Sequence, residues 1–254
     1  MGAGITLPDV FLPIQLDGVD STSEEAGRRA REGAPEGTLI WAGEQSAGRG
    51  RRGRVWLSPA GNLYCSLVVR PDRPAAEAVQ LGFVAGLAVA EAAEALLPDE
   101  RIVSCKWPND VLVGGRKVAG VLLDASSAKD GRCEWVVIGM GINVRWHPGP
   151  GEAEFPATSL VAEGAAGLDP ARLLEVLAPR LRDGLRRWRE QGFAPVRQEW
   201  LRRAFGLHQE MTVRLHDRLL SGTFSGLDPL GAMMLTAAGQ THVLTAGDVV
   251  SVRT

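Results

Sequence analysis

Residues 48–54 bring four arginines and three glycines together in seven consecutive positions. Burying unpaired guanidinium groups in a strand or helix costs on the order of several kcal/mol each, and each glycine weakens a helix by about 1 kcal/mol relative to alanine. We therefore predict a loop. Its glycines let the backbone approach a ligand closely, and its arginines offer two-pronged donors to a carboxylate or a phosphate. A solvated basic loop without a ligand fits the segment equally well.

A second candidate lies where Asp110 precedes a hairpin signal at Gly114-Gly115. If the two glycines form a two-residue turn, Asp110 pairs with Ala119, and Lys117 comes to the same face as a diagonal neighbour about 7–8 Å away. That arrangement suits a substrate phosphate between the two side chains, with Mg²⁺ on the carboxylate side. An ion pair on the sheet surface is the alternative, and a slip of one residue in register would separate the pair.

The third candidate is the start of a helix that reaches about Gly33. Ser21 with Glu24 three positions later fits a capping box. The same N-terminus offers free N–H groups and the hydroxyls of Ser21 and Thr22 to a polar ligand. Both interpretations of this segment stay open.

Composition narrows the class of protein. The chain has 254 residues, of which 45% are hydrophobic, and this suits one large domain, alone or with a small appendage. The net charge of −2 argues against a general nucleic-acid binder. Three cysteines, Cys65, Cys105 and Cys133, suggest neither a disulfide framework nor a zinc site. We see no signal peptide or membrane span and expect a cytoplasmic protein.

Hydrophobic periodicity and turn residues predict the elements that position these candidates. Residues 1–20 are short apolar pieces, and residues 145–168 are expected to be a mobile loop. After Gly206 the pattern changes to five short strands, which suggest a small closed barrel. Strands are predicted at 38–42, 63–69, 102–107, 111–113, 116–123 and 134–138, and helices at 21–33, 74–97, 169–188 and 195–205.

Taken together, these segments resemble the biotin protein ligases. The motifs that carry the resemblance, in the family's order and spacing, are Gly48-Arg49-Gly50-Arg51-Arg52-Gly53-Arg54-x-Trp56, Lys106-Trp107-Pro108-Asn109-Asp110, Arg116-Lys117-x-Ala119-Gly120 and Gly139-x-Gly141-Ile142-Asn143. The ending from Gly222 to Ala232 resembles the family's SH3-like C-terminal domain.

The resemblance implies an α+β fold with two domains. Residues 1–207 would form the catalytic domain, a mixed β-sheet with flanking helices of the class II synthetase-like, biotin–lipoate ligase type. Residues 208–254 would form the SH3-like β-barrel. Nothing before Leu12 suggests a helix-turn-helix, so we expect the short form of the family, without specific DNA binding.

The family couples biotin to a lysine of a biotin carboxyl carrier domain of biotin-dependent carboxylases, with ATP and Mg²⁺. Biotinyl-5′-AMP forms first, with release of pyrophosphate, and biotin then passes to the acceptor amine. The resemblance implies these small molecules and this carrier as partners, with no membrane, and it allows a homodimer.

The resemblance also assigns roles to individual residues. Lys117, Arg49 and Arg51 would be catalytic, and Asp110 with Asn109 would hold Mg²⁺. Residues 145–160 would order over adenine. Biotin or the adenylate would be bound by Ser21, Thr22, Ser23, Gln45, Gly48, Arg49, Gly50, Arg51, Trp56, Lys117, Gly120, Asn143 and Arg253, with Ser23 standing where the family usually has asparagine.

Two other functions compete with this interpretation. A lipoate ligase or octanoyltransferase shares the catalytic fold, but the Arg-Gly run and the C-terminal barrel argue against it. An RNA-binding module could use the arginine loop, but it leaves Asp110, Lys117 and the glycines at 139 and 141 unexplained. Pyrophosphate release that depends on both biotin and ATP distinguishes all three.

Overall fold

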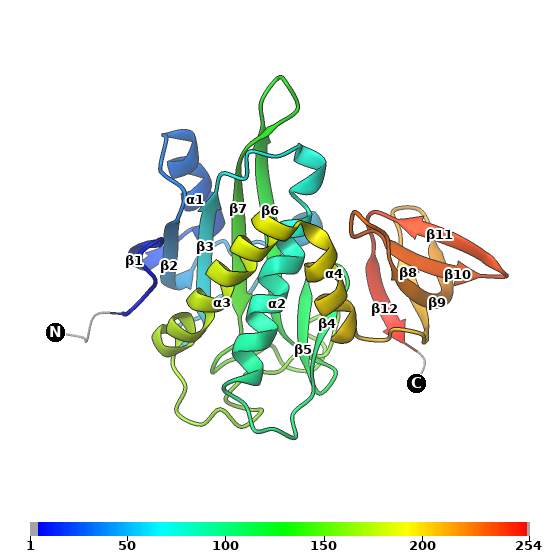
Figure 1. Ribbon diagram of the computed structural model, residues 1–254. Coiled ribbons are helices and arrows are strands. Elements are labelled where there is room, and N and C mark those ends of the chain that lie inside the picture. The colour runs from blue at the N-terminus through cyan, green and yellow to red at the C-terminus, as the bar shows by residue number, and fades with distance from the viewer. Residues whose placement is uncertain (1–4, 253–254) are drawn as a thin grey trace.

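A computed structural model describes residues 5–252 and contains a seven-stranded mixed sheet, as the resemblance implies (Figure 1). The strand order is β1-β2-β3-β7-β6-β5-β4, in which β1 and β2 are parallel and the other neighbours are antiparallel. The strands are β1 (Leu12–Val19), β2 (Thr38–Gln45), β3 (Leu63–Val69), β4 (Val103–Lys106), β5 (Asp110–Val113), β6 (Arg116–Ser127) and β7 (Cys133–Ile142).

The central strands are buried on both faces, because helices cover both sides of the sheet. Side chains alternate between the faces, so Leu39 and Trp41 join the main hydrophobic core while Ile40 packs in a second, smaller cluster. Helix α1 (Thr22–Arg31) covers the smaller cluster through Ala26 and Ala30. Helices α2 (Gln80–Glu94) and α3 (Pro170–Gln191) cover the other face (Figure 1).

Helix α2 is the central helix of the core. Nearly all its side chains are buried, and it packs beside Leu123 of β6 at Gly82. Together with the 3-10 turn before it, the segment Ala75–Glu94 has the length and apolar composition of a membrane-spanning helix. A helix that is hydrophobic all round is also what a buried core position requires, and 72% of this helix's most apolar window is buried in the fold.

Helix α3 matches the prediction from sequence. The carboxylate of Asp169 accepts a hydrogen bond from Arg172 N at 2.8 Å, and Pro170 occupies the first turn. The apolar stripe from Leu173 to Trp188 faces the core. Gly192, at φ 74°, ends the helix and leads directly into α4 (Phe193–Arg202).

A second sheet follows, with the strands in the order β11-β10-β9-β8-β12, and it forms the separate C-terminal unit that the sequence suggests. Its hydrophobic side chains belong to the same core cluster as those of α2 and α4. Trp200 of α4 packs edge-on against Phe224, and the indole N–H of Trp107 donates to the carbonyl of Gly231 at 3.2 Å. The strands are β8 (Glu210–Arg214), β9 (Leu219–Leu227), β10 (Met233–Ala237), β11 (Gln240–Leu244) and β12 (Asp248–Val252). The boundary at 207/208 stays a prediction.

Three local predictions were wrong. Residues 12–19 form an edge strand, whose partly exposed side chains and Pro13 hide the strand pattern. The helix predicted from 74 to 97 is a 3-10 turn (Ala75–Glu77) followed by the shorter α2. The capping box predicted at Ser21 and Glu24 does not form among the described residues. The Ser21 side chain accepts no hydrogen bond from a helix N–H, and the Glu24 carboxylate pairs with Arg49.

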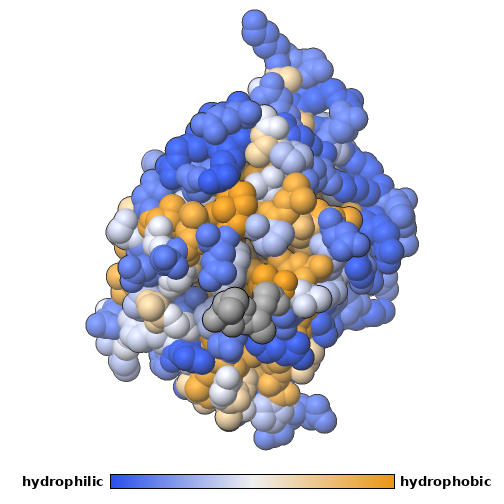
Figure 2. Space-filling model, turned by 90° about the vertical axis from the view of Figure 1, so that its left-hand side faces the viewer, coloured by the Kyte–Doolittle hydropathy of each residue, from blue (hydrophilic) through white to orange (hydrophobic). Residues whose placement is uncertain are grey.

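The edge strand β1 borders an apolar surface. Figure 2 looks onto the side of the molecule that carries β1, and hydrophobic side chains gather near the centre of that face within a hydrophilic surround. Val10 and Leu12 are exposed on this part of the chain. Edge strands with unpaired backbone groups are common sites of association.

The contact between helix α2 and the C-terminal unit makes a testable prediction at Gly231. Its φ is 94°, and an added Cβ would lie 2.7 Å from Cε2 of Phe83, so Gly231→Ala adds a steric clash to backbone strain. Gly239→Ala is the matched control, because its φ is 77° and its surroundings are open within 4 Å. We expect urea denaturation to show Gly231→Ala less stable than Gly239→Ala by about 1–3 kcal/mol. Equal losses would show that the contact tolerates the methyl group.

Candidate active site

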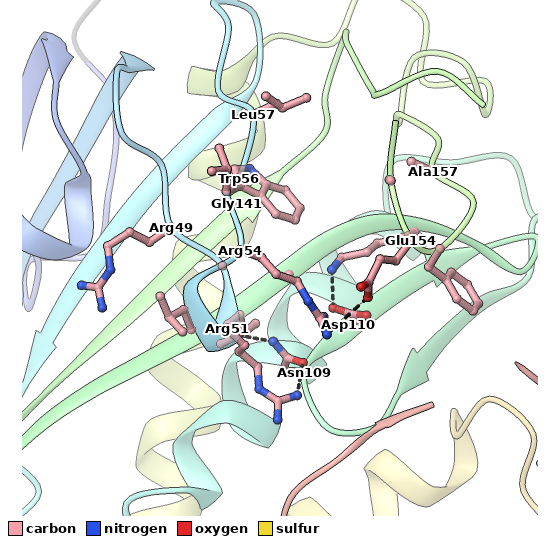
Figure 3. A pocket seen from close by; sticks show the side chains of 18 of the residues that line it. Arg49, Arg51, Arg54, Trp56, Leu57, Asn109, Asp110, Gly141, Glu154 and Ala157 are labelled. Atoms are coloured by element: carbon pink, nitrogen blue, oxygen red, sulfur yellow. Dashed lines mark hydrogen bonds and ion pairs between the residues drawn. The ribbon is translucent and has the colours of Figure 1, made fainter. Parts of the chain in front are cut away.

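A pocket of about 390 Å³ opens between the arginine loop, the N-terminus of α1, the β5–β6 hairpin and the C-terminal sheet (Figure 3). Of the predicted site residues, Gly48 lies at the base of the loop rather than in the wall, and Arg253 lies outside the described residues. The predicted residues that line the pocket are Ser21, Thr22, Ser23, Gln45, Arg49, Gly50, Arg51, Trp56, Asn109, Asp110, Lys117, Gly120 and Asn143.

One end of the pocket is polar and uncharged. Gln45 Oε1 accepts from the backbone N–H of Thr22 at 2.8 Å and lies 3.2 Å from its hydroxyl. Ser66 Oγ lies 2.8 Å from Thr22 Oγ1 and 3.1 Å from Ser23 Oγ. Gln45 Nε2 donates to Ser58 Oγ at 2.8 Å, which fixes the orientation of the amide. This end can hydrogen-bond a polar, neutral group.

The other end contains one carboxylate between two ammonium groups. Asp110 Oδ1 lies 2.6 Å from Lys117 Nζ, and Oδ2 lies 3.2 Å from Lys106 Nζ. The two-residue turn at Gly114-Gly115 forms as predicted, but Asp110 pairs with Gly120 rather than with Ala119. The reason is a β-bulge after Val111, which shifts the register by one residue. The ion pair that the sequence offered as the alternative is present, and it is buried rather than on the surface.

The ionisation of this cluster follows from its geometry. Burial alone would raise the pKa of Asp110, but the charges of Lys117 and Lys106 outweigh it, so the pKa lies below its ordinary value. Burial lowers the pKa of Lys106, and the adjacent Asp110 offsets only part of that effect. With two lysines against one aspartate, the cluster has more basic than acidic groups and favours an anionic ligand.

These residues do not fit the predicted Mg²⁺ site. Both oxygens of Asp110 contact ammonium groups, and Asn109 Oδ1 accepts from Arg51 Nη1 at 3.1 Å. Among residues 5–252 there is no group of three or more His, Cys, Asp or Glu placed to hold a metal ion. A divalent cation would meet three cationic side chains here.

The arginine loop is a short hairpin. Arg49 and Val55 form a bridge, Gly50 N donates to Arg54 O at 2.7 Å, and Arg52 and Gly53 turn the chain with φ of 55° and 73°. The loop prediction is confirmed, because residues 51–53 make only a single 3-10 turn.

The arginines of this loop point in different directions (Figure 3). Arg51 reaches into the pocket toward Asn109, and burial lowers its pKa. Arg49 points away, to Glu24 and to Asp124, whose Oδ2 lies 3.2 Å from Arg49 Nη1. In this arrangement Arg49 anchors the loop rather than covering the pocket.

Trp56 forms the apolar wall, and the motif glycines make room for it. An added Cβ at Gly141 would lie 2.6 Å from Trp56 Nε1, and one at Gly120 would lie 3.2 Å from its ring. The Lys117 ammonium lies 5.1 Å from the centre of the indole. A Cβ at Gly139 would lie 2.3 Å from Ser23 Oγ. These glycines therefore leave the space that Trp56 and Ser23 occupy at the pocket.

The segment predicted to be a mobile loop is anchored beside Lys117. Lys117 N donates to Pro156 O at 2.7 Å, and Thr158 N donates to Lys117 O at 2.9 Å. Asn143 Nδ2 donates to the Thr158 carbonyl at 3.0 Å. These bonds fix the backbone on both sides of Ala157 and bring this segment into the pocket wall.

Six charged residues that line the pocket had no individual role in the sequence analysis: Arg54, Lys106, Glu152, Glu154, Arg214 and Asp248. Lys106 belongs to one of the family motifs, and it is one of only three lysines in the sequence, which could have drawn attention to it. Arg54 stood in the arginine loop and contacts Glu154 at 3.3 Å. Asp248 reaches the same arginine from β12, and nothing local in the sequence indicates this contact, because it joins residues 194 positions apart.

The arrangement combines three properties that a site for an activated carboxylic acid requires. It has neutral hydrogen-bonding groups at one end, an apolar wall at Trp56, and a surplus of positive charge around Asp110 and Arg51. Positive side chains in a partly enclosed site stabilise charge that develops on phosphate or carboxylate oxygens.

Comparison with known proteins agrees with this geometry. Residues 7–202 match the model of the biotin/lipoate A/B protein ligase family. The chain is 39% identical to the biotin–[acetyl-CoA-carboxylase] ligase of Paracoccus denitrificans, covering 91% of this chain and 96% of that protein.

Solved structures are similar over nearly the whole chain. The Aquifex aeolicus biotin protein ligase in complex with biotin and ATP has a TM-score of 0.80 and 31% identity, covering 95% of this chain and 98% of the other. The Leishmania major biotin protein ligase in complex with biotinyl-5-AMP has a TM-score of 0.64 and 26% identity, covering 92% and 98%.

Asp110 predicts how stability depends on pH. Its pKa is lowered from 3.8 in the folded protein, so its stabilising contribution is complete above that value and is lost as the pH falls through the folded pKa. We expect Asp110→Asn to lose about 3–5 kcal/mol near neutral pH, because two ammonium groups lose their counter-charge. In urea denaturation, the gap to wild type should narrow at acidic pH, whereas the exposed control Asp217→Asn should stay near wild type throughout. A constant gap would contradict the lowered pKa.

Proposed function

The chain belongs to the biotin/lipoate A/B protein ligase family, and we propose from this membership how its pocket carries out ATP-dependent biotin–protein ligation. The enzyme activates biotin as biotinyl-5′-AMP and then transfers biotin to a lysine of an acceptor protein. Relatives named as biotin ligases, and similar structures that hold biotin with ATP or biotinyl-5-AMP, support this reaction over lipoate ligation. The observation in this chain that carries it is the cationic cluster beside an apolar wall and a neutral polar end.

In the first step, a biotin carboxylate oxygen attacks the α-phosphorus of ATP. A carbon–oxygen–phosphorus anhydride forms, the bond between the α-phosphorus and the bridging oxygen breaks, and pyrophosphate leaves. We assign Lys117 to the carboxylate and the transferred phosphoryl group, and Arg51 to the phosphate oxygens. Both side chains line the pocket on the side of Asp110, so they can offset the negative charge that gathers there.

The neutral end of the pocket would hold the ring system of biotin. Its ureido group needs donors and acceptors rather than charges, and Ser21, Thr22, Ser23 and Gln45 supply them. Trp56 would cover the aliphatic chain that joins the ring to the carboxylate. The smaller Ser23 leaves more room here than the family's usual asparagine.

In the second step, the neutral amine of the acceptor lysine attacks the carbonyl carbon of the anhydride. A carbon–nitrogen bond forms, the bond to the phosphate oxygen breaks, AMP leaves, and the amine loses a proton to solvent. We propose a biotin carboxyl carrier domain as the acceptor, entering past the exposed Val55 and Leu57 at the pocket mouth.

Location and assembly are proposals of the same kind. A cytoplasmic location agrees with the need for ATP and with three free, buried cysteines. A homodimer is supported by the free edge of β1 and the apolar surface beside it (Figure 2). That the chain does not recognise a DNA sequence stays a prediction from its net charge of −2.

Pyrophosphate release tests the proposed function. Purified protein should release pyrophosphate only when biotin and ATP are both present, and a carrier domain should then gain biotin on its lysine. Lipoate and octanoate serve as competing acids. Equal release with either acid would favour the lipoate-type reaction, and no release with any acid would contradict an adenylate-forming ligase.

Arg51 predicts how tightly the intermediate is held. Its side chain is 21% exposed and contacts Asn109, so Arg51→Gly should leave the fold intact while removing a charge-assisted contact worth roughly 1.5–3 kcal/mol. We expect biotinyl-5′-AMP to escape about 10- to 100-fold faster and to label lysines of an unrelated protein.

A biotin blot of a lysine-rich bystander protein measures that escape, and the exposed Arg218→Gly is the control. If Arg51→Gly labels the bystander no more than the control does, Arg51 does not retain the intermediate.

A further inference from the structure

The C-terminal sheet contacts the arginine loop through one carboxylate. Asp248, the first residue of β12, has a side chain that is only 10% exposed. Its Oδ2 accepts from Arg54 Nη2 at 2.5 Å and from Arg52 Nη1 at 3.0 Å, and its Oδ1 lies 3.5 Å from Arg51 Nη1. Three arginines of the loop, Arg51, Arg52 and Arg54, thus surround a single acidic residue of the C-terminal sheet.

This carboxylate stays charged in the folded protein. Burial would raise the pKa of Asp248, but the hydrogen bond and charge of Arg54 and the charges of Arg51 and Arg52 outweigh burial, and the pKa lies below its ordinary value. Charge-assisted hydrogen bonds in a largely buried setting are the strong ones. The pairing is therefore a stable connection between the two sheets.

The loop has two anchors, one on each side. Arg49 holds its first strand to the catalytic domain through Glu24 and Asp124. Arg52 and Arg54 hold its tip to Asp248 of the C-terminal sheet. Between these anchors Arg51 keeps a hydrogen bond to Asn109 in the pocket. Arg49, Arg52 and Arg54 therefore hold the loop in place, and Arg51, which also lies near Asp248, extends into the pocket.

We propose that Asp248 is a positioning residue that holds the arginine loop closed, so that the C-terminal sheet sets how long the pocket retains its intermediate. The inference rests on the proposed function for the identity of the intermediate. The contacts that hold the loop are made within this chain. Without Asp248, Arg52 loses its ion pair and Arg54 keeps only the one to Glu154 among the described residues, so the hairpin can swing out about its base.

Limited trypsin digestion of the free protein tests the closure. The loop holds four arginines, so an open loop is a trypsin substrate, and the exposed Lys129 in the β6–β7 turn gives an internal reference cleavage. We expect Asp248→Asn to be cut at residues 49–54 about tenfold faster than wild type, relative to Lys129. Asp217→Asn removes a carboxylate from the exposed β8–β9 turn of the same sheet and should behave as wild type.

Retention of the intermediate is the second measurement. Radiolabelled biotinyl-5′-AMP, formed in the pocket and chased with unlabelled intermediate, should dissociate about tenfold faster from Asp248→Asn, which corresponds to about 1.4 kcal/mol. The rate of its formation at saturating ATP should change less than its release. Wild-type cleavage and wild-type retention in the Asp248→Asn protein would overturn the proposal.

Two further variants keep the test decisive. Arg54→Gln removes the other side of the closest contact from a half-exposed position and should show the same rapid cleavage if Asp248→Asn does not fold. The acceleration in the double variant should be smaller than the product of the two single accelerations, because both changes break the Arg54–Asp248 contact. If the two single accelerations simply multiply in the double variant, Arg54 and Asp248 do not act through a shared contact. A wild-type protein that forms no intermediate would refute the proposed function, while the trypsin result would still decide whether Asp248 closes the loop.

Discussion

Asp110 carries one negative charge between the ammonium groups of Lys106 and Lys117, and this imbalance determines what the pocket accepts. A cluster with equal positive and negative charge would attract an anionic ligand only weakly. Two largely buried lysines without a carboxylate would strongly destabilise the folded protein. The β5–β6 hairpin carries both Asp110 and Lys117, and their side chains meet at 2.6 Å although the bulge shifts the register by one residue. The backbone bonds of Lys117 to Pro156 and Thr158 then fix the strand that carries the lysine. The excess charge is thus held in place by the sheet rather than by a flexible loop.

Much of the site could be predicted from sequence because its residues occur in short, unusual clusters. The arginine–glycine run, the hairpin signal and the start of α1 each indicated residues that the structure brings to one pocket, and the Gly114-Gly115 turn formed as its type requires. The fold was predictable for a similar reason: α3 has a cap, an apolar stripe and a terminal glycine within one segment.

The features that could not be predicted depend on contacts between residues far apart in the sequence, or belong to a strand that buries little surface. Asp248 acquires its meaning only when β12 meets the arginine loop, and no local pattern marks it. Strand β1 was missed because an edge strand buries little and need not alternate cleanly. The need for glycine at 139 and 141 also depends on residues far along the chain, since a Cβ at Gly139 would collide with Ser23 and one at Gly141 with Trp56.

The hydrophobic core runs without interruption from α2 through α4 into the C-terminal sheet. Phe83 packs against Phe193 and Trp200, and Trp200 in turn meets Phe224 of β9. Two units that look separable in the sequence are therefore joined through aromatic surface that neither could leave in water. The small sheet is not a detachable accessory. A chain cut between the two sheets would expose the aromatic side chains of Phe83, Phe193 and Trp200 to water.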